Sequence, residues 1–208
     1  MEKINQARPM QPDPEAPKVY LAGPEVFLPD PGPVAERKKA LCAQYGLRGM
    51  FPLDLEIDLH GLRPQEMGLA ISEANEQLLR LCDLVVANLT PFRGPSADVG
   101  TVFEIGYGHG LGLPVYGYSN VSGDFETRTR KYDSGHTRKN DDEGYVDSLG
   151  MDIERFGLND NLMLDGGILL SRGRFFTCDA PQGELYTHLA AFEQCLEHAA
   201  RTLFPGRA

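Results

Sequence analysis

Short apolar runs alternate with longer amphipathic segments along this chain, and the apolar runs predict strands. The clearest is 83–89, DLVVANL, which contains two adjacent valines and ends at Thr90 and Pro91. A run of this kind is typical of a strand that is buried on both faces of a sheet. The same reasoning predicts further strands within 18–23, 49–57, 113–119 and 166–171.

The segments between these apolar runs have the periodicity of amphipathic helices. Apolar residues that recur every three or four positions predict helices over 34–45, 69–81, 99–112 and 184–203, with 62–68 as a connection. Strands that alternate with helices favour an α/β fold, so we expect a flavodoxin-like or Rossmann-like three-layer sandwich around a mostly parallel sheet of about five strands. In such sheets ligands bind beyond the carboxyl ends of the strands.

Two segments lack this regular pattern. Residues 1–17 are polar and rich in proline, and we expect a flexible arm there. Residues 120–150 are polar and charged, with GHTRKNDDEG at their centre, and they predict a long mobile insertion rather than a second domain. The remainder of 18–208 is expected to form a single domain.

The net charge of the chain limits the kinds of molecule that it is expected to bind. The 208 residues carry 30 acidic and 20 basic side chains, a formal net charge of −10. Such a surface repels phosphate backbones, so no nucleic-acid polymer is expected as a partner, whereas a small uncharged nucleoside is compatible with it. The four cysteines form no CxxC pair, and the sequence has neither a signal-peptide core nor an apolar run of transmembrane length. We therefore expect a cytoplasmic protein without a membrane partner.

The candidate chemistry lies in DVGTVFEIGYGHGLG, residues 98–112. Asp98 is a suitable N-cap for the predicted helix, and it places Glu104 in the second turn among apolar neighbours, where a carboxylate is unusual. Gly100 and Gly108 lie four residues to either side of Glu104, which on a helix forms one stripe. The stripe predicts a shallow groove on both sides of the carboxylate, where a flat ligand could approach. The residues alone leave a second interpretation open, in which the glutamate faces solvent and the glycines allow tight packing.

Three segments of the chain resemble the nucleoside 2-deoxyribosyltransferases. They are KVYLAGPEVF at 18–27, NEQLLRLCDLVVANLTPFRGPSADVGTVFEIGYGHG at 75–110, and FGLNDNLML at 156–164. The core is Asp-Val-Gly-x-x-x-Glu-x-Gly-Tyr. The resemblance implies transfer of a 2-deoxyribosyl group from a 2'-deoxynucleoside to a free nucleobase. It also implies a covalent glycosyl-glutamate intermediate and no cofactor or metal.

The resemblance assigns roles to individual residues. Glu104 matches the nucleophile, Asp98 the neighbouring carboxylate that helps to hold the sugar, and Tyr20 a first-strand tyrosine that contacts the nucleophile. Asn161 and Met163 match residues that complete a neighbouring subunit's pocket. These two residues imply a homo-oligomer with shared active sites.

The base-binding side departs from the family pattern. Asn75 stands where many members carry an aspartate, and an amide cannot donate a proton as an acid, so the group that protonates the base is open. Glu56 aligns with a base-contacting glutamine. Gly23, Phe27 and Gly100 complete the predicted substrate-binding residues, with Phe27 able to stack on a base.

Two functions other than deoxyribosyl transfer are compatible with this fold and these residues. Hydrolysis of 2'-deoxynucleoside 5'-monophosphates is the first alternative, although the segment 161–163 favours a free 5'-hydroxyl. A non-catalytic nucleoside or nucleotide sensor is the second, and the joint presence of Glu104 and Tyr20 argues against it. His188, Cys195 and His198 have spacing that could suggest zinc, but on an amphipathic helix a packing or surface role is favoured.

Overall fold

The computed structural model describes residues 13–205, and its centre is a five-stranded parallel sheet. The strands are β1 (Lys18–Ala22), β2 (Arg48–Met50), β3 (Leu84–Asn88), β4 (Val115–Ser119) and β7 (Phe175–Thr177). Their order in the sheet is β2-β1-β3-β4-β7, and every pairing is parallel. This is the flavodoxin-like order. The chain first adds β2 on one side of β1 and then adds β3, β4 and β7 on the other side, so the order of strands switches between β1 and β3. The predicted fold class is confirmed.

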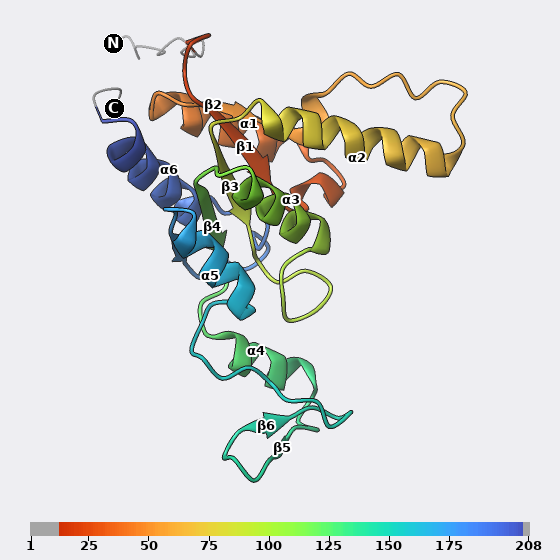
Figure 1. The fold of residues 1–208 in the computed structure, drawn as a ribbon, viewed down its shortest axis with the longest axis vertical. Helices are drawn as coiled ribbons and strands as arrows, with labels where there is room; N and C mark the ends of the chain where they lie inside the picture. The colour runs from red at the N-terminus through yellow and green to blue at the C-terminus, as the bar shows by residue number, and fades with distance from the viewer. Residues whose placement is uncertain (1–12, 206–208) are drawn as a thin grey trace, which may run out of the picture.

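Helices cover both faces of the sheet. They are α1 (Gly32–Gln44), α2 (Pro64–Arg80), α3 (Val99–Gly110), α5 (Leu162–Leu170) and α6 (Ala190–Leu203). Helices α1 and α6 pack on one face, and α2, α3 and α5 pack on the other (Figure 1). Alternate residues of each strand supply the two cores, because successive side chains of a strand point to opposite faces.

A buried ion pair lies in the layer formed by α1 and α6. Lys38 Nζ is 2.5 Å from Glu25 Oε1, and both side chains are 0% exposed. Glu25 also accepts hydrogen bonds from Asn88 Nδ2 at 3.0 Å and from the hydroxyl of Tyr118 at 2.9 Å. Glu25 belongs to the short helix η1 (Pro24–Phe27), so these contacts fix the loop after β1 against the ends of β3 and β4. A Cβ at Gly23 would lie 2.0 Å from Glu25 Oε2, which excludes any larger residue there.

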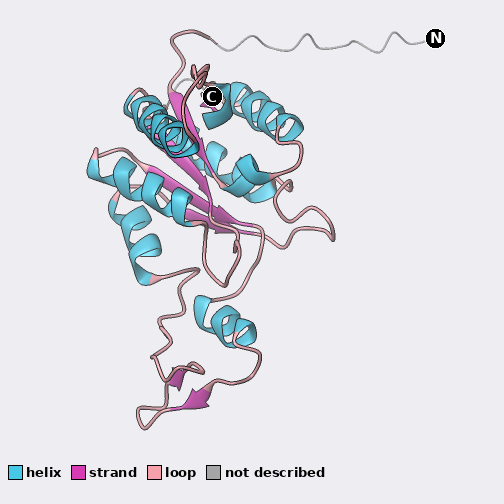
Figure 2. Cartoon of the chain, turned by 90° about the vertical axis from the view of Figure 1, so that its right-hand side faces the viewer, coloured by secondary structure: helices cyan, strands magenta, loops and turns pink. Residues whose placement is uncertain are grey.

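The segment between β4 and α5 contains α4 (Phe125–Tyr132) and a small antiparallel pair, β5 (Arg138–Lys139) with β6 (Tyr145–Val146). The sequence pattern predicted no elements there. Figures 1 and 2 show this segment projecting beyond one end of the sandwich. It leaves the sheet at the carboxyl end of β4, the side on which a ligand site is expected.

The prediction of a last strand at 166–171 is wrong, because residues 166–170 belong to α5, Ser171 is its C-cap, and the last strand is β7. Asn161 caps α5 by accepting a hydrogen bond from Met163 N at 3.0 Å. A fully apolar run does not distinguish a buried helix from a buried strand, and the cap decides for helix.

Three further boundaries differ from the prediction. Helix α2 already begins at Pro64 within the predicted connection 62–68, because the Glu66 carboxylate accepts a hydrogen bond from Arg63 N and closes the first turn. Helix α6 begins only at Ala190, since Asn120 Nδ2 binds the carbonyl groups of Leu185 and His188. The second strand is shorter than 49–57 and is followed by the turn η2 (Pro52–Asp54).

Residues 13–17 of the predicted arm form a turn in which Ala16 is buried, and residues 1–12 lie outside the described part. The four cysteines are free thiols. Within the described residues, no helix combines the length and the apolar character needed to span a bilayer.

Candidate active site

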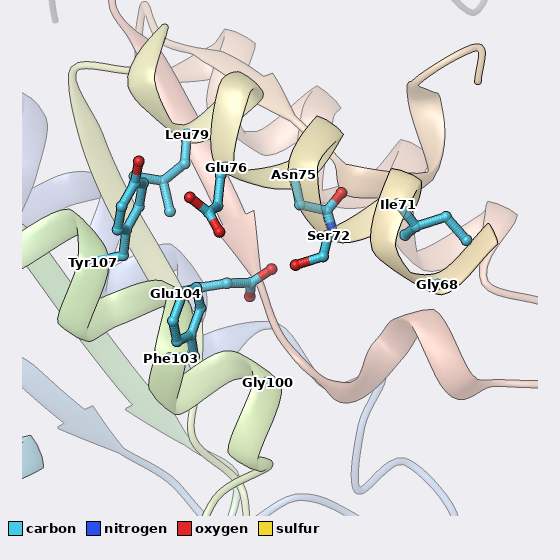
Figure 3. Close-up of a pocket in the computed structure, with 10 residues that line it drawn as sticks. All are labelled: Gly68, Ile71, Ser72, Asn75, Glu76, Leu79, Gly100, Phe103, Glu104 and Tyr107. Atoms are coloured by element: carbon cyan, nitrogen blue, oxygen red, sulfur yellow. The ribbon is translucent and has the colours of Figure 1, made fainter. Parts of the chain in front are cut away.

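A cavity of about 250 Å³ lies between α2 and α3 (Figure 3). Its walls are formed by Gly68, Ile71, Ser72, Asn75, Glu76 and Leu79 from α2, and by Gly100, Phe103, Glu104 and Tyr107 from α3. The first turn of α3 follows the carboxyl end of β3, so this cavity lies on the ligand-binding side of the sheet. Three of the predicted site residues, Asn75, Gly100 and Glu104, meet in these walls.

A hydrogen bond from Tyr20, on strand β1, holds the Glu104 carboxylate in place. Tyr20 is fully buried on β1, and its hydroxyl donates a hydrogen bond of 2.5 Å to Glu104 Oε1. Since β1 is a central strand paired on both sides, the phenol has little freedom to move. One carboxylate oxygen is thereby fixed, and the carboxylate as a whole points into the cavity (Figure 3).

Burial raises the pKa of Glu104 to about 7. The hydrogen bond from Tyr20 lowers this pKa, and the negative charge of Asp98 raises it. Burial, with the adjacent Glu104 charge, also raises the pKa of Tyr20, so the phenol stays protonated and remains a donor. A carboxylate with a pKa near neutrality is a feature of functional sites, because it gains or loses a proton near working pH.

Asp98 is the N-cap of α3, as predicted. Its Oδ2 accepts hydrogen bonds from the backbone N of Thr101 at 2.9 Å and from the Thr101 hydroxyl at 3.1 Å. Gly100 opens the cavity wall, but a Cβ at Gly108 would lie 2.8 Å from Val85 Cγ2. The predicted groove on both sides of Glu104 is therefore wrong for Gly108, which instead allows α3 to pack closely on β3.

Comparison with known proteins decides the family. Residues 19–163 match the family model described as nucleoside 2-deoxyribosyltransferase. The chain belongs to the nucleoside 2-deoxyribosyltransferase family. Membership supports an enzyme that acts on the N-glycosidic bond of nucleosides, by deoxyribosyl transfer or by the related N-glycosidase reaction.

The chain is similar to several individual proteins. An uncharacterised protein of Schizosaccharomyces pombe is 30% identical over 169 residues, which cover 76% of this chain and 80% of the relative. The structure of a 2-deoxyribosyltransferase from Leishmania mexicana is 26% identical with a TM-score of 0.55, and the match covers 88% of this chain and 98% of that one. A conserved protein from Enterococcus faecalis V583 is 20% identical with a TM-score of 0.47 over the same shares.

Three further predicted site residues, Gly23, Phe27 and Glu56, do not form part of the cavity walls. Phe27 is 56% exposed and stacks on Phe92 with ring centroids 5.3 Å apart, while the Arg93 guanidinium lies 5.2 Å from the Phe27 ring centroid. Gly23 sits at the end of β1 against Glu25. Glu56 is exposed in the segment after η2. It is not one of the described residues that line the cavity.

Asn161 and Met163 lie on the other side of α3. Met163 is 72% exposed and lines a separate apolar groove of about 540 Å³ between α3 and α5, together with Val102, Gly106 and His109. Asn161 caps α5 and donates a hydrogen bond of 2.5 Å to Glu154 Oε1. Within one chain the structure does not bring these two residues to Glu104.

Among the cavity residues that sequence reasoning missed are a hydroxyl and a carboxyl group, those of Ser72 and Glu76. In Figure 3 their polar groups and the Glu104 carboxylate point into the same space from facing helices. Helical spacing could have found them, because Ser72, Asn75, Glu76 and Leu79 fall at positions that share one face of a helix. Among the described residues, no group of three or more His, Cys, Asp or Glu side chains is arranged to hold a metal ion.

Proposed function

We propose that this protein transfers the 2-deoxyribosyl group of 2'-deoxynucleosides between nucleobases through a covalent intermediate on Glu104. One observation carries the proposal: Glu104 faces a cavity on the ligand-binding side of the sheet, with one oxygen bound by Tyr20 at 2.5 Å. That contact leaves the other oxygen available to attack. The low exposure of the carboxylate makes it a stronger nucleophile than a solvated one.

In the first step, a Glu104 oxygen attacks C1' from the face opposite the base and forms a glycosyl ester. The N-glycosidic bond breaks, and its electron pair leaves with the base nitrogen. Glycosidic cleavage passes through a state with oxocarbenium character, which the carboxylate stabilises and then traps. A 2'-deoxy sugar reaches this state more readily because it lacks the electron-withdrawing 2'-hydroxyl.

In the second step, a nitrogen of the incoming base attacks C1', and the ester bond breaks to restore the Glu104 carboxylate. Two inversions return the β configuration. The first base departs before the second enters, so the kinetics are ping-pong.

The departing base takes up a proton, which Asn75 cannot supply as an acid. Glu76 is the second carboxyl group in the cavity walls and lies one residue after Asn75 on the same helix. We assign it the transfer of this proton, either directly or through one water molecule, and in the second step the Glu76 carboxylate takes up the N–H proton that the incoming base loses.

We also propose a homo-oligomer in which a neighbouring subunit completes the site. Large apolar side chains are exposed on α5 beside the groove that Met163 lines, among them Leu170 and Leu169, and others are exposed on α3, among them Val99. Exposed large apolar side chains beside an apolar groove mark an interaction surface, and the family resemblance assigns Asn161 and Met163 to a neighbour's pocket.

Hydrolysis of 2'-deoxynucleoside 5'-monophosphates is the alternative. A 5'-phosphate is bound by serine hydroxyls, arginines or helix N-termini. Here the Ser96 hydroxyl is engaged with Asp160 at 2.5 Å, and the Arg93 guanidinium lies over the rings of Phe27 and Phe92. These contacts favour a substrate with a free 5'-hydroxyl.

One assay tests the proposal. The protein is incubated with deoxyinosine, with and without adenine, and the products are separated by chromatography. We expect deoxyadenosine when adenine is present, and its loss in Glu104→Ala. Release of hypoxanthine at the same rate with and without adenine, and no deoxyadenosine, would contradict transfer and support hydrolysis.

A further inference from the structure

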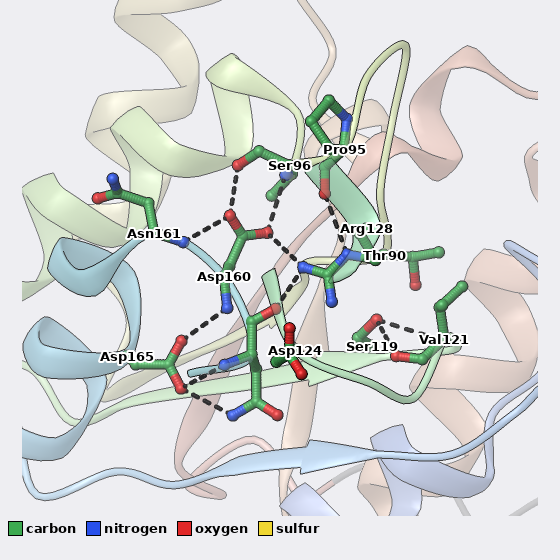
Figure 4. Close-up of polar contacts among 12 residues, drawn as sticks. Thr90, Pro95, Ser96, Ser119, Val121, Asp124, Arg128, Asp160, Asn161 and Asp165 are labelled. Atoms are coloured by element: carbon green, nitrogen blue, oxygen red, sulfur yellow. Dashed lines mark hydrogen bonds and ion pairs between the residues drawn. The ribbon is translucent and has the colours of Figure 1, made fainter. Parts of the chain in front are cut away.

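The segment between β4 and α5 is joined to the loop before Asp98 through one buried carboxylate (Figure 4). Asp160, just before α5, is 0% exposed at its side chain. It accepts hydrogen bonds from the Ser96 hydroxyl at 2.5 Å, from Ala97 N at 3.1 Å and from Asn161 N at 2.7 Å. Asp160 thus contacts the residue directly before Asp98 and the N-cap of α5 at the same time.

Arg128 of α4 neutralises and extends this contact. Its Nη2 lies 3.6 Å from Asp160 Oδ2, its Nε donates to the carbonyl of Pro95 at 3.1 Å, and its Nη1 donates to that of Gly123 at 2.8 Å. The guanidinium also donates to the carbonyl of Asn159. One side chain therefore links the start of the projecting segment, its end and the loop after β3.

A second carboxylate secures the end of the segment. Asp165 on α5 accepts hydrogen bonds from Asp160 N at 2.9 Å and from Asn159 Nδ2 at 2.7 Å. The backbone of residue 160 is thereby fixed to α5, while its side chain is fixed to the loop before α3. A buried carboxylate with this many donors has one favourable position, because any displacement leaves charge or a polar group unpaired.

We infer that Asp160, held by Arg128, is a positioning residue for the reaction at Glu104, and that the segment 120–160 acts as a brace for the loop that carries Asp98. This inference rests on the proposed function. Asp98 caps α3, and Glu104 lies six residues later on the same helix, so the position of 95–97 sets where the nucleophile meets the sugar. The same carboxylate fixes Asn161, the residue offered to a neighbouring subunit.

The test uses three variants and a matched control. Asp160→Asn keeps the shape but presents an amide N–H to donors, Arg128→Met removes the guanidinium, and Arg128→Lys keeps only its charge. Asp133→Asn is the control, because Asp133 accepts hydrogen bonds from Ser148 N and Oγ within the same segment and does not contact the loop 95–97. Each protein is assayed for base exchange from deoxyinosine, with kcat and KM measured separately from pH 5 to 9.

For Asp160→Asn and Arg128→Met we expect kcat/KM to fall about 100-fold, the size of effect that a misplacement near 1 Å produces. The loss should fall mainly on kcat and be accompanied by a shift of the acid limb of the pH profile. Arg128→Lys should recover part of the loss, and Asp133→Asn should stay within about 3-fold of the parent. If Asp160→Asn does not fold, the two Arg128 variants carry the comparison. Parental kcat/KM in Arg128→Met, or an equal loss in Asp133→Asn, would overturn the inference.

Hydrogen exchange of the peptide covering 93–101 provides a second readout that does not depend on activity. We expect faster exchange in Arg128→Met than in the parent and in Asp133→Asn. If the parent protein shows no more base-exchange activity than Glu104→Ala, only the proposed function is refuted. Hydrogen exchange of the peptide 93–101 would then still decide whether the brace exists. Unchanged exchange in Arg128→Met would refute the brace.

Discussion

The hydroxyl of Tyr20 donates a 2.5 Å hydrogen bond to Glu104 Oε1 and joins a central strand to the helix of the proposed nucleophile. This bond lowers the pKa of Glu104, against burial that raises it to about 7. In Tyr20→Phe the pKa of Glu104 should therefore rise further. The ascending limb of kcat/KM against pH should move to higher pH, and activity at pH 6 should fall about 10-fold or more, as for the loss of a hydrogen bond to a charged group.

The matched control for this change is Tyr116→Phe. Tyr116 is also buried in the sheet, but its hydroxyl binds His198 on the opposite face. This variant should keep the parental pH profile. An unshifted limb in Tyr20→Phe, or an equal shift in Tyr116→Phe, would show that the phenol does not tune Glu104.

The ionised Glu104 carboxylate should lower the free energy of unfolding at high pH. Its carboxyl has a pKa of about 7 in the folded protein against 4.5 as the ordinary value, so the folded state binds the proton more tightly. This contribution to the unfolding free energy is fully present below about pH 4.5 and is lost as pH rises through about 7. Glu104→Gln removes that loss, so at pH 8 the free energy of unfolding in urea should exceed that of the parent by at most about 3 kcal/mol.

The same comparison at pH 5 should show a much smaller gain. Unfolding by urea at both pH values measures it, with Glu73→Gln on the exposed face of α2 as the control. A gain in Glu104→Gln that does not change between pH 5 and pH 8 would mean that the carboxyl is not perturbed in the folded protein.

The sequence predicted the sheet well because its strands are short apolar runs bounded by turn residues, as at 83–89. It failed at 166–171, where an apolar run is compatible with either a strand or a helix, and only the Asn161 cap distinguishes them. It also missed α4, because that helix has a strongly polar sequence and depends on Arg128 contacts from distant parts of the chain. Such contacts are not encoded in local periodicity.

The candidate site was predictable where a motif carried it. Glu104, Asp98 and Tyr20 were assigned from short motifs, and the Tyr20 contact to Glu104 was expected before it was observed. The place of Glu76 in the cavity was not predicted, because it depends on which face of α2 packs against α3. Gly108 was misread because a glycine that opens a groove and one that allows close packing look the same in a sequence.

Glu76→Gln tests the source of the proton. Cleavage of deoxyadenosine should slow about 100-fold, the usual contribution of a positioned general acid. A 7-methylated 2'-deoxyguanosine should be cleaved at nearly the parental rate, because its base leaves as a neutral species without taking up a proton. Glu73→Gln is the matched control on α2. Equal slowing of both substrates would assign Glu76 a binding role instead.

Gly108→Ala should destabilise the fold, because the new methyl group meets Val85 Cγ2 at 2.8 Å. We expect a loss of about 1–3 kcal/mol in the free energy of unfolding, the usual cost of overpacking. Gly110→Ala, at the end of the same helix with open space around it, should be neutral or slightly stabilising. Denaturant unfolding of the two variants separates packing from helix propensity, and equal stability of both would contradict the close approach of α3 to β3.

Met163→Glu should disrupt the proposed oligomer, because it places a charge in the apolar groove between α3 and α5. Sedimentation should show dissociation to the monomer, and base exchange should fall by at least about 100-fold if the site is shared. Leu149→Glu, an equally exposed apolar position in the projecting segment, should leave both unchanged. A parental protein that sediments as a monomer and is fully active would refute the shared site.

The pairing of β1 with β3 has a consequence for how the protein reaches its native state. These adjacent central strands are separated in the chain by α1, β2 and α2, so their registry requires the closure of a long loop. Contacts between distant parts of a chain form late and slowly compared with local helices. Tyr20 cannot meet Glu104, 84 positions away, until that closure is complete. During refolding, helical signal should therefore return before catalysis, and enzymatic activity reports the last stage of folding rather than the first.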